Sequence, residues 1–253
     1  MSVSIKSAKE IDLMREAGRR LEIVHTKLGE FIKPGISTKD IDRYGEELIR
    51  GLGCIPNFLN YNGYPASICV SVNDEVVHGI PRTDHILQEG DIVSLDAGLI
   101  YKGFHSDAAR TYGVGEISKE AQQLIDVTRE SFFKGIEFAR AGHHLHEISA
   151  AIGAYAESFG YGVVRDLVGH GIGTSLHEDP QIPNFAQKRR GIRLVPGMTL
   201  AIEPMINAGR YDVCWLDDDW TVVTDDGSLS AHYENTVLIT DGEPEILTLN
   251  TMR

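Results

Sequence analysis

Four acidic residues stand in or beside segments that are otherwise apolar enough to form buried strands. Asp96 and Glu203 each follow an apolar run, and Glu234 precedes one. Asp107 follows Asp96 by eleven residues, and a turn at 102–103 would return it to the neighbourhood of Asp96 on an antiparallel strand. A buried carboxylate costs several kcal/mol unless it is paired or binds a cation, so this pattern indicates a metal site.

A simpler reading exists for each acid alone, namely a strand end where the carboxylate contacts water or an arginine. That reading weakens for four acids together because the strands contain few basic residues, of which Arg110 is the nearest in sequence. His170 lies in a segment of alternating glycines and adds an imidazole, although such a histidine taken alone is more often structural. Four carboxylates and one imidazole suit two divalent ions, from among Mn, Fe, Co and Zn.

Other catalytic signatures are missing from the sequence. It contains no His-Glu-x-x-His motif, nucleophile elbow, phosphate-binding loop or dinucleotide-binding fingerprint. Cys54, Cys69 and Cys214 are too scattered for a thiolate zinc site, and their odd number argues against a disulfide framework. The histidine cluster at 143–146 is better explained as a polar turn between helices than as a second metal site.

The positions of these residues repeat within the chain. Five positions recur with one constant offset: Gly35 and Gly142, Ile41 and Ile148, Gly53 and Gly160, Gly90 and Gly197, Asp96 and Glu203. His78 and His177 stand between these blocks, each in a His-x-x-Pro sequence. We therefore expect a single catalytic domain over residues 1–253, made of pseudo-repeat halves at about 1–115 and 116–253.

Each half predicts two helices followed by strands. Helices are expected from Ser7 to a stop near Pro34, from Ser37 to about Gly53, from Glu120 to about Ala139, and from Leu145 to about Phe159. Strands are expected over 67–72, 91–97, 104–112, 199–204, 220–224 and 233–239. Helices segregated from strands indicate an α+β fold, with the helix pairs covering one face of a sheet built from both halves.

Composition excludes several classes of protein. The chain has 253 residues, 42% of them hydrophobic, and a net charge of −13, which is typical of an acidic globular protein and unfavourable for nucleic-acid binding. The one basic run, at 188–193, is expected to be a solvated loop. No stretch is apolar enough to span a membrane, and the first residues do not resemble a signal peptide. A cytoplasmic location is therefore expected.

The ligand order Asp96, Asp107, His170, Glu203, Glu234, with His78 and His177 outside it, resembles the type I methionine aminopeptidases of the pita-bread metallopeptidase family. The resemblance runs from about Ser4 to the C-terminus and includes the segments 76–81 and 169–173. It implies a pita-bread fold, in which a curved, mainly antiparallel sheet is covered by two pairs of helices. Asn62 and Phe58 depart from some relatives, which carry histidine and a smaller residue there.

The resemblance also implies the roles of the site residues. Asp96 and Asp107 would hold one metal ion, and Asp107, His170, Glu203 and Glu234 the other, with Asp107 and Glu234 bridging. A hydroxide between the ions would attack the scissile carbonyl, and Glu203 would transfer its proton. His177 would stabilise the oxyanion, and His78 would bind the peptide. The methionine pocket would consist of Tyr61, Tyr64, Cys69, Leu176 and Trp220, although Cys69 is also explained as a small buried hydrophobe.

The implied activity is removal of the initiator methionine from nascent proteins, with a preference for a small second residue. The implied partners are a peptide with a free N-terminal methionine and two divalent ions, and the protein is expected to be a monomer. A monovalent cation near Asn73 and Ser230 and a ribosome contact remain open. Two rivals are an aminopeptidase P or prolidase, which usually carries an extra N-terminal domain, and a binding protein of the same fold without catalysis.

Overall fold

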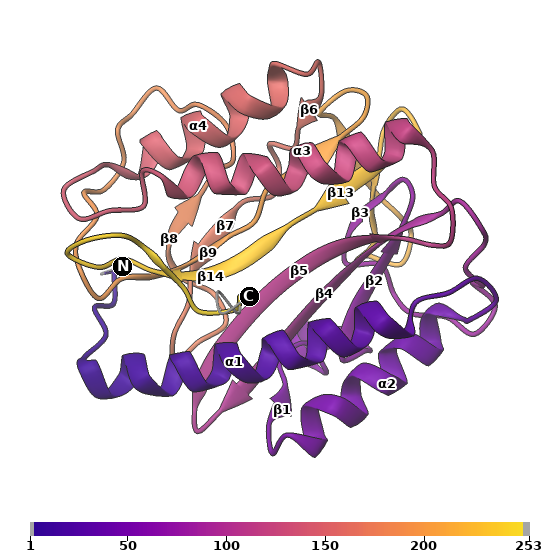
Figure 1. The fold of residues 1–253 in the computed structure, drawn as a ribbon, viewed down its shortest axis with the longest axis horizontal. Coiled ribbons are helices and arrows are strands. Elements are labelled where there is room, and N and C mark those ends of the chain that lie inside the picture. Colours follow the sequence, from indigo (N-terminus) through magenta and orange to yellow (C-terminus); the bar gives the residue numbers. More distant parts are fainter. Residues whose placement is uncertain (1–2, 250–253) are drawn as a thin grey trace.

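The computed structural model describes residues 3–249, and its helices and strands follow the predicted order (Figure 1). The helices are α1 (Ala8–Phe31), α2 (Thr38–Gly51), α3 (Lys119–Ile136) and α4 (Leu145–Glu157). The strands are β1 (Ile55–Pro56), β2 (Ile68–Val72), β3 (Glu75–Val77), β4 (Ile92–Tyr101), β5 (Phe104–Gly113), β6 (Gly162–Val163), β7 (Gly169–Gly171), β8 (Glu178–Ile182), β9 (Thr199–Ile202), β10 (Met205–Asn207), β11 (Val213–Trp215), β12 (Val222–Thr224), β13 (Ser230–His232), β14 (Glu234–Leu238) and β15 (Glu245–Ile246).

One antiparallel sheet joins the two halves of the chain. Its strand order is β1-β4-β5-β14-β9-β7-β8, with β2 paired to β4 and β15 to β14. Strand β14 therefore lies between β5 of the first half and β9 of the second, pairing Asn235 with Ala108 on one side and with Ile202 on the other. Two smaller sheets, β13-β10-β6 and β11-β12-β3, flank it. The predicted α+β class and antiparallel sheet are confirmed.

Both helix pairs lie on the same side of the sheet, α1 and α2 over the first half and α3 and α4 over the second (Figure 1). On β4, Val93, Leu95 and Leu99 belong to the buried cluster that α1 and α2 cover. On β9, Leu200 and Ile202 belong to the cluster under α3 and α4. Because side chains alternate along a strand, the residues between these apolar positions face away from the helices.

The internal repeat is visible in the backbone. The Gly35 amide donates to the Leu87 carbonyl at 2.8 Å, and the Gly142 amide donates to the Leu194 carbonyl at 2.9 Å. Both glycines have a positive φ, 89° and 93°, which other residues rarely adopt. Isolated bridges join Ser37 to Ile86 and His144 to Arg193, again at matching places in the two halves. The offset read from the sequence therefore marks two copies of one structural unit.

The observed bounds differ from the prediction at several ends. Helix α1 stops at Phe31, before Pro34, and β4 continues past Ala97 to Tyr101 because it pairs with β5 along its whole length. The predicted strand over 220–224 begins only at Val222, since Asp218 accepts hydrogen bonds from the Trp220 and Thr221 amides and holds them in a turn. Within residues 3–249, no helix is both long and apolar enough to cross a membrane.

Candidate active site

Strand alternation brings the predicted acids to one face of the sheet. Asp96 lies between Leu95 and Ala97, both of which pack toward the helices, so its own side chain points the other way. Asp107 precedes the helix-facing Ala108 on β5, and Glu203 follows Ile202 at the end of β9. The hairpin between β4 and β5 pairs Gly98 with Asp107, which confirms that Asp107 returns to the neighbourhood of Asp96.

Glycines make room for the candidate ligands. A Cβ on Gly98 would lie 2.8 Å from Asp107 Oδ1 and 2.4 Å from Asn57 Nδ2, so no larger residue fits opposite this carboxylate. A Cβ on Gly169 would lie 2.4 Å from the Ala201 carbonyl oxygen. The backbone around His170 therefore packs directly against strand β9, which explains the alternating glycines.

Five side chains converge on one point of this face. Asp107, His170 and Glu234 offer ligand atoms that all lie within 4.8 Å of one another. His170 Nε2 is 3.6 Å from Glu203 Oε1 and 4.0 Å from Asp107 Oδ2. Asp96 lines the same cavity. Asp107 and Glu234 are buried, whereas Asp96 and Glu203 are partly exposed to the cavity.

This crowding of acids changes their proton affinities. Burial raises the pKa of Asp96 to about 7. Burial, reinforced by the neighbouring carboxylates, also raises the pKa of Asp107 and Glu234 well above the usual range, and burial and Asp96 do the same for Glu203. Burial lowers the pKa of His170 to about 3, so its imidazole is neutral and can offer a lone pair.

Divalent cations fit this cluster. Asp96 Oδ1, Asp107 Oδ1 and Glu234 Oε1 are buried and have no hydrogen-bond partner within residues 3–249. In the same part of the chain no lysine or arginine forms an ion pair with any of the four acids. Arg110 instead donates to the carbonyl oxygens of Ala109 and Glu234 and to Asn235 Oδ1. Unpaired carboxylates around a neutral imidazole form a hard-donor set typical of Mn²⁺, Fe²⁺, Co²⁺ or Zn²⁺.

The acids form the floor of a cavity of about 200 Å³. Every predicted site residue lines it, and Phe58 and Asn62 do too: Phe58, Tyr61, Asn62, Tyr64, Cys69, His78, Asp96, Asp107, His170, Leu176, His177, Glu203, Trp220 and Glu234. Its walls are largely aromatic, with the Tyr64 and Trp220 rings packed edge to face at 5.1 Å between centroids. Cys69 is buried, and burial raises the pKa of its thiol. The structure thus brings the two sequence halves together around one pocket.

His78 and His177 enter this cavity from separate loops. His78 has a positive φ of 60°, a conformation uncommon among residues other than glycine, and its ring packs against Trp220. The His177 ring packs against His170 with centroids 4.3 Å apart, and its Nδ1 is 2.7 Å from the Tyr61 hydroxyl. Burial lowers the pKa of His78 to about 4 and also lowers that of His177, so both imidazoles are neutral near pH 7.

Sequence reasoning missed two residues that contact the site. His232 is buried, and its Nε2, which has no hydrogen-bond partner among the described residues, lies 3.9 Å from Glu203 Oε2. The Asn184 side-chain amide donates to the Glu203 carbonyl at 3.0 Å. The position of His232, two residues before Glu234, is a signal that could have identified it. Asn184 lies in a loop without any such signal.

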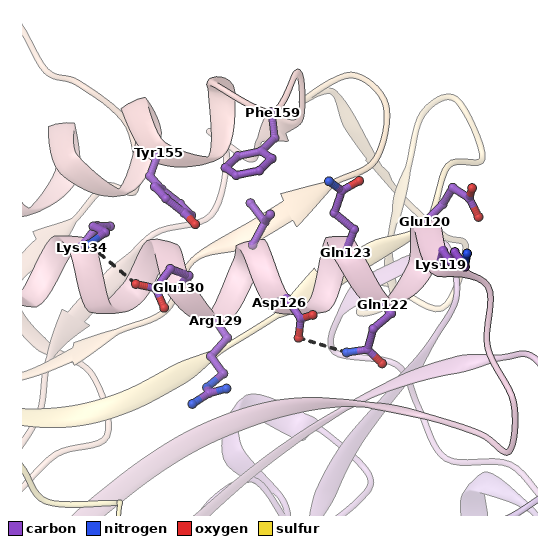
Figure 2. Close-up of a pocket in the computed structure, with 11 residues that line it drawn as sticks. Lys119, Glu120, Gln122, Gln123, Asp126, Arg129, Glu130, Lys134, Tyr155 and Phe159 are labelled. Atoms are coloured by element: carbon purple, nitrogen blue, oxygen red, sulfur yellow. Dashed lines mark hydrogen bonds and ion pairs between the residues drawn. The ribbon is translucent and has the colours of Figure 1, made fainter.

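A larger hollow of about 1110 Å³ lies elsewhere, on the outer face of α3 and α4 (Figure 2). Its lining is mostly charged and polar, and Lys134 pairs with Glu130 there while Gln122 bonds Asp126. None of the predicted site residues lines it. The histidine cluster at 143–146 is also separate from the acids, and His143 bonds Glu147 at 2.8 Å. The small acidic cavity is therefore the candidate active site.

Comparison with known proteins agrees with this geometry. A family model described as metallopeptidase family M24 matches residues 12–241. The methionine aminopeptidase of Clostridium acetobutylicum is 56% identical over 247 residues, which cover 98% of this chain and 99% of that protein. The crystal structure of the methionine aminopeptidase of Thermotoga maritima aligns with a TM-score of 0.96 at 44% identity, covering 98% of this chain and 100% of that one.

A more distant match bears on the rival interpretation. The structure of an Xaa-Pro dipeptidase from Bacillus anthracis aligns with a TM-score of 0.79 at 26% identity. The alignment covers 98% of this chain but only 63% of the dipeptidase. The chain therefore matches its methionine aminopeptidase relatives over nearly their full length and the dipeptidase over part of its length.

Proposed function

Because the chain belongs to metallopeptidase family M24, we propose that it removes N-terminal methionine from peptides in this cavity, using metal ions held by the five converging side chains. The similarity to methionine aminopeptidases over nearly the full length indicates a metal-dependent aminopeptidase that acts on N-terminal methionine. One observation above all supports a metal site that acts on a bound methionine: buried carboxylates without a protein partner lie at the end of a small aromatic pocket.

The family resemblance implies how the ligands divide between two ions. Asp96, Asp107 and Glu234 would hold one divalent ion, and Asp107, Glu234, His170 and Glu203 the other. Divalent ions bound here would lower the pKa of water and polarise a substrate carbonyl. The compactness of the Asp107, His170 and Glu234 cluster supports this assignment, as does the lack of a protein partner for the buried carboxylate oxygens.

The remaining polar residues act on the substrate and its protons. Glu203 is partly exposed to the cavity and lies beside the other proposed ligands, so its carboxylate can accept a proton from the attacking water and pass it to the leaving amine. His177 donates a hydrogen bond to the scissile carbonyl oxygen as negative charge develops there. His78 contacts the peptide on the side of Trp220.

The residues of the pocket walls suit the binding of a methionine side chain. Tyr61, Tyr64, Cys69, Leu176 and Trp220 give an apolar enclosure, and a thioether interacts favourably with aromatic rings. The cavity is small and Phe58 adds bulk to it, which supports a preference for a small second residue and for a free amino end.

A peptide panel with controlled metal content tests the proposal. After treatment with a strong chelator, activity should disappear and return with Co²⁺, Mn²⁺, Fe²⁺ or Zn²⁺. Met-Ala-Ser and Met-Gly peptides should be cleaved, Met-Lys and Met-Phe peptides poorly, and N-acetylated Met-Ala-Ser not at all. Rapid cleavage of Xaa-Pro peptides instead would favour a prolidase-like activity, and full turnover by verified metal-free protein would contradict the metal assignment.

Several expectations stay predictions. A monovalent cation is still expected near Asn73 and Ser230. These two residues lie side by side, because the Ser230 amide donates to the Asn73 carbonyl at 2.8 Å. Five further expectations also stay predictions. They are the metal used in the cell, a ribosome contact, the cytoplasmic location, a monomeric state and the organisation as a single catalytic domain.

A further inference from the structure

A hydrogen bond crosses the mouth of the cavity between the two halves of the chain. The Tyr61 hydroxyl lies 2.7 Å from His177 Nδ1, and the two rings lie 5.4 Å apart at an angle of 46°. Tyr61 is half-buried and His177 lies at the exposed rim. Within residues 3–249, this is the one hydrogen bond that the His177 ring makes.

The loop that carries Tyr61 is held in a defined shape. Asn60 and Asn62, on either side of Tyr61, have positive φ values of 65° and 50°, a conformation that asparagine tolerates better than most residues. The Tyr61 amide donates to the Phe58 carbonyl at 2.9 Å, and the Tyr64 amide donates to the Tyr61 carbonyl at 2.9 Å. This tight turn places the phenol over the cavity.

The opposite loop is also anchored close to its histidine. Glu178, the next residue after His177, pairs with the buried Lys6 ammonium at 2.7 Å and accepts from the Ser175 amide at 3.2 Å. Both partners of the Tyr61–His177 contact therefore come from constrained segments. Such a contact is suited to fixing the orientation of a side chain.

We propose that Tyr61 is a positioning residue, whose hydroxyl donates to His177 Nδ1 and so leaves the imidazole proton on Nε2. A neutral imidazole carries one N–H, and its other nitrogen can only accept. With Nδ1 accepting from Tyr61, Nε2 is the remaining ring nitrogen and is a donor. A donor at Nε2 is what a developing oxyanion requires, whereas the opposite tautomer would present a lone pair to it.

The choice of a phenol for this position has a chemical consequence. A carboxylate on Nδ1 would stabilise the imidazolium and favour proton transfer, as in a general acid or base. A phenol carries no charge, so it sets the tautomer and the ring orientation without promoting protonation. Tyr61 thus makes His177 a hydrogen-bond donor and leaves proton transfer to Glu203.

A double-mutant cycle tests this inference, which rests on the proposed role of His177. Tyr61→Phe keeps the aromatic wall and removes only the hydroxyl. It should lower kcat about 3- to 10-fold, as expected for one lost hydrogen bond, with KM for Met-Ala-Ser nearly unchanged. In the His177→Ala background, the same change should alter kcat by less than 2-fold, since its target is gone. Tyr211→Phe, at an exposed ring, is the matched control and should behave as wild type.

The tautomer is measured independently of activity. In zinc-loaded protein labelled with ¹⁵N-histidine, the His177 signals, identified by their loss in His177→Ala, should show an unprotonated Nδ1 and a protonated Nε2. Tyr61→Phe should shift both signals toward a mixture of tautomers while its melting temperature stays close to wild type. A protonated Nδ1 in wild type would overturn the inference.

The outcomes separate this inference from the proposed function. If His177→Ala lowers kcat strongly and Tyr61→Phe costs the same factor with and without His177, Tyr61 acts directly on substrate and the inference fails alone. If His177→Ala retains normal kcat, the proposed oxyanion role of His177 fails and the catalytic part of this inference fails with it.

Discussion

The hydroxyl of Thr236 lies between the amide and the carbonyl of Asp107, accepting a hydrogen bond from the first at 3.1 Å and donating one to the second at 2.9 Å. Strand pairing between β5 and β14 covers only Ala108–Ala109 and Glu234–Asn235, so the Thr236 side chain continues the contact where the ladder ends. The Thr236 hydroxyl thereby links the backbone of Asp107, a proposed ligand, to β14, the strand that carries the proposed ligand Glu234.

Thr236→Val should therefore weaken both the fold and the metal site. The substitution preserves shape but leaves a buried amide and a buried carbonyl of Asp107 without this partner, at a cost of about 1–3 kcal/mol. Urea denaturation of the metal-free protein measures that loss, and a competitive chelator titration measures metal affinity. Thr236→Ser retains the hydroxyl and should recover most of both quantities. Equal stability of the valine variant and wild type would contradict the argument.

Metal binding should release protons, and more of them at low pH. Burial raises the pKa of Asp96 to about 7 and also raises that of its three acidic neighbours, so protons compete with the metal below that pH. The apparent dissociation constant for Mn²⁺ should fall as pH rises from 6 to 8. Calorimetry in buffers of different ionisation enthalpy gives the number of protons released. A pH-independent affinity would exclude raised pKa values for these carboxyls.

Glu203→Gln should reduce kcat more than it disturbs the fold. The amide keeps the size of the side chain but cannot accept the proton, and general base catalysis contributes about 10²–10⁴-fold. Weaker metal binding should add to the loss, so kcat is compared at saturating metal. Glu157→Gln, an exposed substitution near the end of α4, is the control and should be silent. A kcat within a few-fold of wild type would remove Glu203 from the proton pathway.

Acid should destabilise the protein partly through His25. This residue of α1 is buried, its Nε2 bonds the Ala108 carbonyl at 2.8 Å, and burial lowers its pKa from an ordinary 6.5 to about 3. The unfolded chain then binds a proton that the folded chain excludes between those values. Stability contributed by neutral His25 is complete above pH 6.5 and is lost as pH falls toward 3.

His25→Gln keeps a donor near Ala108 but cannot titrate in this range. The free energy of unfolding of wild type should fall by about 2 kcal/mol more than that of the variant between pH 7 and pH 5. Because the other buried histidines are common to both proteins, the difference isolates His25. Parallel pH profiles would show that His25 is protonated or exposed in the folded state.

The parts of the fold that follow local periodicity could be predicted from the sequence. The apolar runs along 92–97 and 199–203 predicted the strands, and the unexpected acids within or beside them predicted the candidate ligands. Their common location followed from the repeat, because Asp96 and Glu203 occupy matching places in two copies of one unit.

Other features depend on long-range packing that no local pattern encodes. Strands β7 and β8 are short and rich in glycine or charge. They form because β9 offers an edge to β7, and β7 in turn offers one to β8. The approach of His232 to Glu203 requires β10 and β13 to pair in a particular register. The contact between Tyr61 and His177 joins two irregular loops, whose relative position depends on the assembled sheet.

The place of β14 between β5 and β9 has a consequence for the order in which the molecule is made. In the strand order β1-β4-β5-β14-β9-β7-β8, all the other strands precede β14 in the sequence and are translated before it. Both β5 and β9 therefore present an unpaired edge until β14 is made. Such unpaired edges are prone to aggregation, so we expect the chain to be most prone to aggregate before β14 has been made. A chain that ended before Glu234 would lack both this shared strand and one of the five proposed ligands, so we expect it to have no peptidase activity.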